Sequence, residues 1–329
     1  MTDVLTTAID DEQQDTRFVD LVRRLSAQSV VKHFDAYADV DWDAPDMAIN
    51  THDLRFELDS DNPLGATEWY RSLPADTRAE MGLRAIVANM KAGLQFESIL
   101  KRGLLEYAFK LPDGAPEFRY AYHEVIEEAH HSLMFQEFVN RSGLEVQGLT
   151  WDMKFGARRV IAMARRFPAQ FFVFVLGGED PIDHVQRTVL RSGRDLHPLL
   201  ERIMRIHVTE EARHLSFARQ YLRTTVPTLS RRQRAMMSIQ APIILHTMAG
   251  VMMRPPKDLV RRYHIPHDVL REAYPRDGTA AQAVRDSLRK VRELLVELGL
   301  VGPVSKRLWK RLRLWDDPAL PAADGTGLT

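Results

Sequence analysis

Two short segments decide the fold of this chain: EEAHH at residues 127–131 and EEARH at residues 210–214. Each contains a glutamate followed three residues later by a histidine, and each falls inside a long stretch with helical periodicity. Side chains three residues apart on an α-helix lie on nearly the same face, so a carboxylate and an imidazole can bind one metal ion together. Glu-x-x-His pairs on two helices are typical of carboxylate-bridged metal sites in helical bundles. The two segments therefore predict a metal site between helices.

The first segment allows two registers, because Glu127 and His130 have the same spacing as Glu128 and His131. The face of Glu128 and His131 continues through apolar residues, namely Ala121, Val125, Phe135 and Phe138. The face of Glu127 and His130 is polar along its length, as expected for a solvated side. Amphipathicity therefore favours Glu128 and His131 as the metal-binding pair. Glu124 also falls on the inner face, and we expect it to accept a hydrogen bond in the layer of residues that surrounds the metal ligands.

A four-helix site also needs carboxylates from two other helices. In the predicted helix at residues 76–110, Glu97 lies in an otherwise apolar stripe. A buried carboxylate is costly there unless a partner or a metal ion compensates for it. In a later segment, Glu179 follows an apolar run, with Asp180 and Asp183 as alternative ligands.

One further histidine, His207, precedes Glu211 by four residues and His214 by seven, so the three side chains share one helix face. The candidate ligands then number four glutamates and three histidines: Glu97, Glu128, His131, Glu179, His207, Glu211 and His214. This pattern resembles the p-aminobenzoate N-oxygenase family, the non-haem di-iron enzymes that oxidise arylamines. The third histidine distinguishes that family from other ferritin-like proteins, and the resemblance covers roughly residues 80–250.

The resemblance implies that all seven residues bind two iron ions, with manganese as the alternative because carboxylate and imidazole sites accept both. It also implies O2 as a co-substrate, an external electron donor such as a reductase or ferredoxin, a small-molecule substrate and a homodimer. The function implied is a monooxygenase reaction, in particular N-oxygenation, on a small aromatic amine or a related molecule. The alternatives are a di-iron oxidase or desaturase acting on a lipid-like substrate, and a ferritin-type iron-handling protein.

The composition of the chain excludes several other classes of protein and of metal site. The 45 basic and 45 acidic residues cancel, so no net field attracts nucleic acid, and no nucleic-acid partner is expected. The chain has no cysteine, which excludes disulfides and thiolate metal sites. The acidic N-terminus lacks the apolar run of a signal peptide. Because no stretch approaches the ~18 uncharged apolar residues of a spanning helix, we expect a cytoplasmic protein without a transmembrane segment.

Helical periodicity without strand-like alternation predicts an all-α fold, a ferritin-like four-helix bundle core with additional helices in one domain, residues 1–329. Residues 1–15 are predicted to be disordered, and residues 35–75, rich in Asp, Pro and aromatics, to form an irregular N-terminal wrap. The segment at residues 168–192 is predicted to break at its Gly-Gly pair and its proline. Residues 303–315 predict a basic amphipathic tail helix, which docks on the protein or, alternatively, makes peripheral membrane contact.

Overall fold

The computed structural model describes residues 2–315, with the side chains of residues 16–315. Every regular element in that range is a helix, which confirms the predicted all-α class. The five longest are α1 (Thr2–Val31), α3 (Ala75–Ala108), α4 (Pro116–Ser142), α6 (Pro168–Arg191) and α7 (Pro198–Thr225). The others are α2 (Glu68–Arg71), α5 (Trp151–Arg166), α8 (Arg231–Met252), α9 (Lys257–Arg262), α10 (His267–Ala273), α11 (Thr279–Ser287), α12 (Arg289–Glu297) and α13 (Pro303–Arg311). Short 3-10 turns lie at Pro45–Met47, Leu54–Phe56 and Val226–Thr228.

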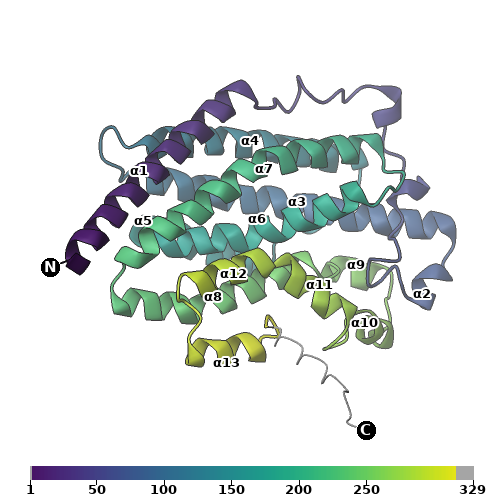
Figure 1. Cartoon of the computed structure of the whole chain (residues 1–329). Coiled ribbons are helices and arrows are strands. Elements are labelled where there is room, and N and C mark those ends of the chain that lie inside the picture. The colour runs from purple at the N-terminus through teal and green to yellow at the C-terminus, as the bar shows by residue number, and fades with distance from the viewer. Residues whose placement is uncertain (1, 316–329) are drawn as a thin grey trace, which may run out of the picture.

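Four helices, α3, α4, α6 and α7, form the core of the molecule. α3 packs against α4 and α6, and α7 packs against the same two helices, so the four enclose one interior. Figure 1 shows them running alongside one another, with α1 crossing over α4 and α7 on one side. On the other side α8, α11 and α12 pack on α6, and α13 packs on α8. Side chains from four different helices can therefore meet in the interior.

The helix ends leave both glutamate–histidine segments near the middle of long helices. α4 begins at Pro116, where the missing N–H costs nothing because the first turn has no intrahelical acceptor for it. It ends at Ser142, and the next residue, Gly143, adopts a left-handed conformation with φ of 63°. α7 likewise begins with a proline, Pro198. Ligands carried mid-helix have rigid backbones, which suits a site that needs fixed geometry.

The predicted break in α6 is wrong, because the helix runs through Gly177, Gly178 and Pro181 without interruption. The glycines serve close packing instead. A Cβ atom on Gly178 would lie 2.1 Å from the ring of Phe96 on α3, and one on Gly177 would lie 2.9 Å from Leu245 on α8. α6 is thus held tightly between two neighbours, and Glu179 directly follows the two glycines.

The N-terminal region also differs from the sequence prediction. Residues 2–15, predicted to be disordered, continue α1 as helix. The stretch up to Val31 contains no glycine or proline, so nothing in it interrupts a helix once the following residues dock. Residues 35–75 contain only short helical pieces, and their side chains Trp42 and Phe56 enter the core beside α3, α4 and α7.

The tail helix α13 docks on the protein. Trp309 is fully buried in the main core cluster, and Trp315 packs against that cluster. The helix ends at Arg311, and Arg313 adopts a left-handed conformation with φ of 61°. The apolar side of this segment therefore contacts the protein's own core.

One helical stretch has the composition of a membrane span. Within the described residues, Arg231–Arg262 contains an 18-residue window that is long and apolar enough to cross a membrane, and 33% of that window is buried. This stretch includes α8, which packs on α6 and α13. Core helices pass the same test, so the stretch is weak evidence for a span.

Candidate metal centre

The seven residues predicted as metal ligands lie together at the centre of the four-helix core. All are at most 2% exposed. They come from α3 (Glu97), α4 (Glu128 and His131), α6 (Glu179) and α7 (His207, Glu211 and His214). Their oxygen and nitrogen atoms form several groups of three within 4.8 Å of one another. The predicted set is therefore one spatial cluster.

Two carboxylates occupy the middle of this cluster. Glu128 lies 3.3 Å from Nδ1 of His131 on its own helix and 3.0 Å from Nδ1 of His214 on α7. Glu211 lies 3.1 Å from Nδ1 of His214 and 3.6 Å from Nδ1 of His131. Each carboxylate thus reaches both histidines, which is the position of a group that can bridge two metal ions.

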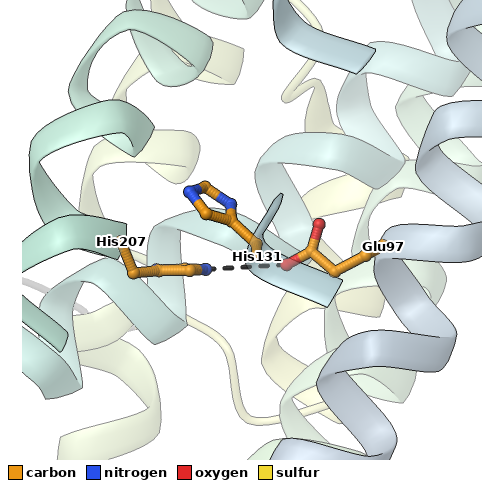
Figure 2. Close-up of side chains that lie close together, drawn as sticks. All are labelled: Glu97, His131 and His207. Atoms are coloured by element: carbon orange, nitrogen blue, oxygen red, sulfur yellow. Dashed lines mark ion pairs between the residues drawn. The ribbon is translucent and has the colours of Figure 1, made fainter. Parts of the chain in front are cut away.

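His207 and Glu97 lie on one side of the centre. Figure 2 shows the two side chains pointing toward one another across the core, with His131 beside them. The Nε2 atom of His207 is 3.6 Å from Oε1 of Glu97, and the rings of His131 and His207 have centroids 4.6 Å apart. Burial lowers the pKa of His207 to about 4, so its imidazole is neutral at pH 7. Neutral imidazole is the form that binds metal ions.

Glu179 enters the cluster, whereas its aspartate neighbours are paired elsewhere. Asp180 forms an ion pair with Arg219, and Asp183 accepts a hydrogen bond from Nε of Arg187 at 2.7 Å. Burial, followed by the neighbouring carboxylates, raises the pKa of Glu179 well above its usual value. The geometry therefore favours Glu179 over Asp180 and Asp183 as the α6 ligand.

Glu124 is closer to the centre than the sequence predicts. It is buried, and one of its oxygens falls within 4.8 Å of donor atoms from Glu128 and His214. Burial raises the pKa of its carboxyl to about 7. Glu124 is thus an additional carboxylate at the edge of the cluster, one turn before Glu128 on α4.

A second layer of glutamates orients two of the histidines. The Nε2–H of His214 donates to Glu127 at 2.8 Å, and the Nε2–H of His131 donates to Glu210 at 2.9 Å. Each outer glutamate therefore holds the histidine of the opposite helix. A hydrogen bond on Nε2 fixes the ring and leaves Nδ1 facing the centre, the usual second-layer arrangement of metal-binding histidines.

The polar face of Glu127 and His130 is only partly solvated, contrary to the prediction. Glu127 is 2% exposed because α1 packs over this side of α4. His130 is partly buried outside the cluster, and its Nδ1 accepts the backbone N–H of Ala36 at 3.1 Å. The structure thus brings Glu128 and His131 to the centre, the register that the sequence favours, and gives Glu127 a supporting position.

Two supporting residues were missed by the sequence reasoning. Arg213 is 6% exposed, and its Nη2 lies 2.8 Å from Glu127 and 3.5 Å from Glu210. Glu210 also accepts the backbone N–H of Phe34 at 3.0 Å. The doubled glutamate of both segments is a signal that could have found Glu210, whereas no repeated residue marks Arg213, because the first segment has His130 at that position.

The charge and hydrogen bonding of this interior fit bound metal ions. Seven buried carboxylates lie here: Glu97, Glu124, Glu127, Glu128, Glu179, Glu210 and Glu211. The buried guanidinium of Arg213 balances part of their charge. Within residues 16–315, Glu97, Glu179, His207 and Glu211 have buried side-chain atoms without a hydrogen-bond partner. Such atoms are rare in folded proteins, and divalent cations would satisfy both the lone pairs and the excess negative charge.

Comparisons with known proteins agree with this geometry. A family model described as P-aminobenzoate N-oxygenase AurF matches residues 15–299. Two relatives, described as uncharacterized proteins of Mycobacterium bovis and Mycobacterium tuberculosis, are 38% identical over 309 residues, or 94% of this chain and 91% of theirs. No solved structure matches. The chain therefore belongs to the p-aminobenzoate N-oxygenase AurF family, a family of di-iron oxygenases.

Proposed function

We propose that the protein is a non-haem di-iron monooxygenase that uses O2 to oxidise a small aromatic amine or a related substrate, in particular by N-oxygenation. The observation that carries the proposal is His207. It is a third buried histidine, in addition to those of the two Glu-x-x-His pairs, and neither of its ring nitrogens has a hydrogen-bond partner within the described residues. An eighth candidate, Glu124, lies at the edge of the same site.

Within this proposal the seven clustered residues hold two metal ions, iron with manganese as the alternative. Glu128 and Glu211 would each help to hold both ions, because each lies close to both His131 and His214. When bound, two iron ions would supply the reduction of O2 with electrons from an external donor such as a reductase or ferredoxin.

The protein's own contribution is orientation and the exclusion of water. The outer glutamates Glu127 and Glu210 fix the rings of His214 and His131. Phe135 packs beside the histidines, with its ring centroid 5.4 Å from that of His207. Rigid donors in a dry interior need little reorganisation during a reaction, which is the main way in which a protein lowers such barriers.

The test combines metal analysis with single-turnover oxidation. We expect two iron ions per chain, and we expect the chemically reduced protein, exposed to O2 with a panel of aromatic amines, to yield an N-oxygenated product. Many irons per chain would support a ferritin-type role instead. Two irons with no amine oxidation, but with oxidation of a fatty acyl substrate, would support the lipid oxidase alternative. One metal ion per chain would contradict the two-metal site.

We also propose a homodimer, as the resemblance implies. One face of α4 carries a row of exposed apolar side chains: Phe118, Tyr122, Ile126 and Leu133. Rows of this kind are typical of protein–protein contacts. The measurement is the molar mass in solution of the wild type and of Ile126→Lys. A monomeric wild type would contradict the dimer, and a dimeric variant would place its interface elsewhere.

A further inference from the structure

An apolar cavity lies beside the metal centre. Its volume is about 440 Å³, and residues of α3, α4, α5, α6 and α8 line it. Phe96 next to Glu97, Phe135 beside His207, and Pro181 and Ile182 just after Glu179 line its inner wall. The charged side chain among its lining residues is Asp152, which is exposed. A molecule in this cavity would have its inner end close to the ligand cluster.

A second, larger chamber adjoins the cavity and has the opposite character. It has a volume of about 1330 Å³ and shares lining residues with the cavity, among them Asn89, Met153 and Met253. Its lining includes Lys257 and six arginines, Arg254, Arg261, Arg271, Arg276, Arg311 and Arg313, against the single carboxylate of Asp258. Arg313 is paired with Asp277 at 3.4 Å, and Arg261 donates to Gln147 at 3.2 Å. The chamber therefore has an excess of positive charge at the outer end of an apolar cavity.

We propose that the substrate is an amphipathic anion, whose apolar, amine-bearing end occupies the cavity and whose carboxylate or phosphate lies among the arginines of the outer chamber. This inference rests on the proposed function for the identity of the reacting end. Arginine binds both kinds of anion through paired N–H donors. A carboxylate inside the cavity would lose its hydration without gaining a cationic partner from the lining. The anionic group must therefore be separated from the amine by the length of the cavity.

This requirement disfavours small aromatic amines whose carboxylate is attached directly to the ring. In 4-aminobenzoate a single ring separates the amine from the carboxylate. With the amine at the ligand cluster, the carboxylate would remain in the apolar cavity. A longer molecule such as 4-(4-aminophenyl)butanoate extends its carboxylate toward the basic chamber, and its amide has the same length without the charge.

The test is calorimetric binding to the metal-loaded protein without O2. We expect 4-(4-aminophenyl)butanoate to bind about tenfold more tightly than its amide or 4-aminobenzoate, with an affinity that falls as salt increases. A phosphate monoester of the same length distinguishes the two anions. Equal affinity for the acid and its amide, or tighter binding of 4-aminobenzoate, would overturn the proposal.

Matched variants test the basic chamber independently of the apolar cavity. Arg254→Gln combined with Lys257→Gln should weaken binding of the long carboxylate about tenfold and leave that of its amide unchanged. Arg232→Gln, an exposed α8 arginine outside the chamber, should have no effect. A loss for both compounds, or for neither, would contradict the assignment of the anion.

The cavity itself can be filled at Gly156 on α5, where an added Cβ meets no atom within 4 Å. Gly156→Leu should abolish binding of both the acid and the amide without loss of folding, whereas Gly156→Ala should retain it. Unchanged binding to Gly156→Leu would overturn the placement. Because all these measurements exclude O2, they can succeed while turnover fails, which would reject the proposed oxygenase reaction and keep the binding site. Conversely, amine oxidation without the charge preference would keep the reaction and reject the amphipathic substrate.

Discussion

The two helices that carry the glutamate–histidine segments invite comparison, because residues 124–131 of α4 and 207–214 of α7 align without a gap as EVIEEAHH and HVTEEARH. The last five positions serve nearly the same roles in both. In each segment the first of the two adjacent glutamates, Glu127 or Glu210, is hydrogen-bonded to the histidine of the opposite helix. The second, Glu128 or Glu211, lies at the centre of the cluster. The repeated motif therefore produces an almost symmetric pair of half-sites.

The first position of the alignment breaks that symmetry. It is Glu124 on α4 and His207 on α7, and both side chains are buried at the cluster. Burial raises the pKa of Glu124 to about 7 and lowers that of His207 to about 4. The two halves of the cluster thus differ in one side chain, a carboxyl group on α4 and a neutral imidazole on α7. If the cluster holds two metal ions as proposed, this unequal position would give the two ions different surroundings.

The seventh position differs as well. It is Arg213 on α7 and His130 on α4. Arg213 is buried against both outer glutamates, whereas His130 contacts the backbone of Ala36 outside the cluster. The α7 half thus supplies the positive charge for the outer layers of both halves.

The largest expected effect comes from the positions that the two helices share. We expect Glu128→Ala and Glu211→Ala each to lose both metal ions, because each carboxylate contacts the histidines of both halves. Metal content per chain is the measurement. Glu293→Ala, at an exposed position on α12, is the control and should keep two ions. A Glu128→Ala protein that retains two metals would show that the shared carboxylates do not bridge.

The next effect tests the charge asymmetry. Removing one partner of a buried ion pair costs about 3–5 kcal/mol, so Arg213→Gln should lower the free energy of unfolding by about that amount. His130→Ala should lower it by about 1 kcal/mol, since one hydrogen bond is lost at a partly exposed site. Chemical denaturation of both variants, at fixed metal content, measures the difference. Equal losses would mean that the outer layer does not depend on Arg213.

A smaller effect should appear equally in both halves. Glu127→Gln and Glu210→Gln keep an acceptor for the histidine N–H but remove the charge that strengthens the imidazole as a ligand. We expect each to weaken metal affinity about tenfold, the lower end of the usual effect of second-layer partners. Competition with a chelator of known affinity gives the value. A strong effect in only one variant would show that the outer glutamates are not equivalent.

The least change in metal content is expected at the unequal position. His207→Ala leaves six of the seven proposed ligands, so it should keep two irons but lose or divert the reaction of the reduced protein with O2. Glu124→Ala should keep both the irons and the reaction. Iron content and O2-dependent optical changes are compared in parallel for the two variants. Wild-type behaviour of His207→Ala would remove the main support for N-oxygenation.

The sequence predicts α3, α4 and α7 and six of the seven clustered residues, because each feature is a property of a single helix: periodicity, spacing, and a charge in an apolar stripe. It leaves Glu179 open against Asp180 and Asp183, because the expected break in α6 hides which side chains share a face. It does not predict the burial of Glu127, since that burial depends on α1 covering α4. The continuity of α6 was missed for a similar reason. A Gly-Gly pair next to a proline usually marks a break, and only the contact of Gly178 with Phe96 shows that the glycines admit a neighbouring helix.

The segment that follows α1 has a consequence for the order in which the protein assembles. The backbone N–H of Phe34 donates to Glu210 of α7, and that of Ala36 donates to His130 of α4. This segment therefore covers both halves of the site. Until it closes, Glu210 lacks one of the contacts that aim it at His131. We therefore expect metal ions to bind after the N-terminal helix has docked. Limited proteolysis between residues 32 and 44 should cut the metal-free protein faster than the loaded one.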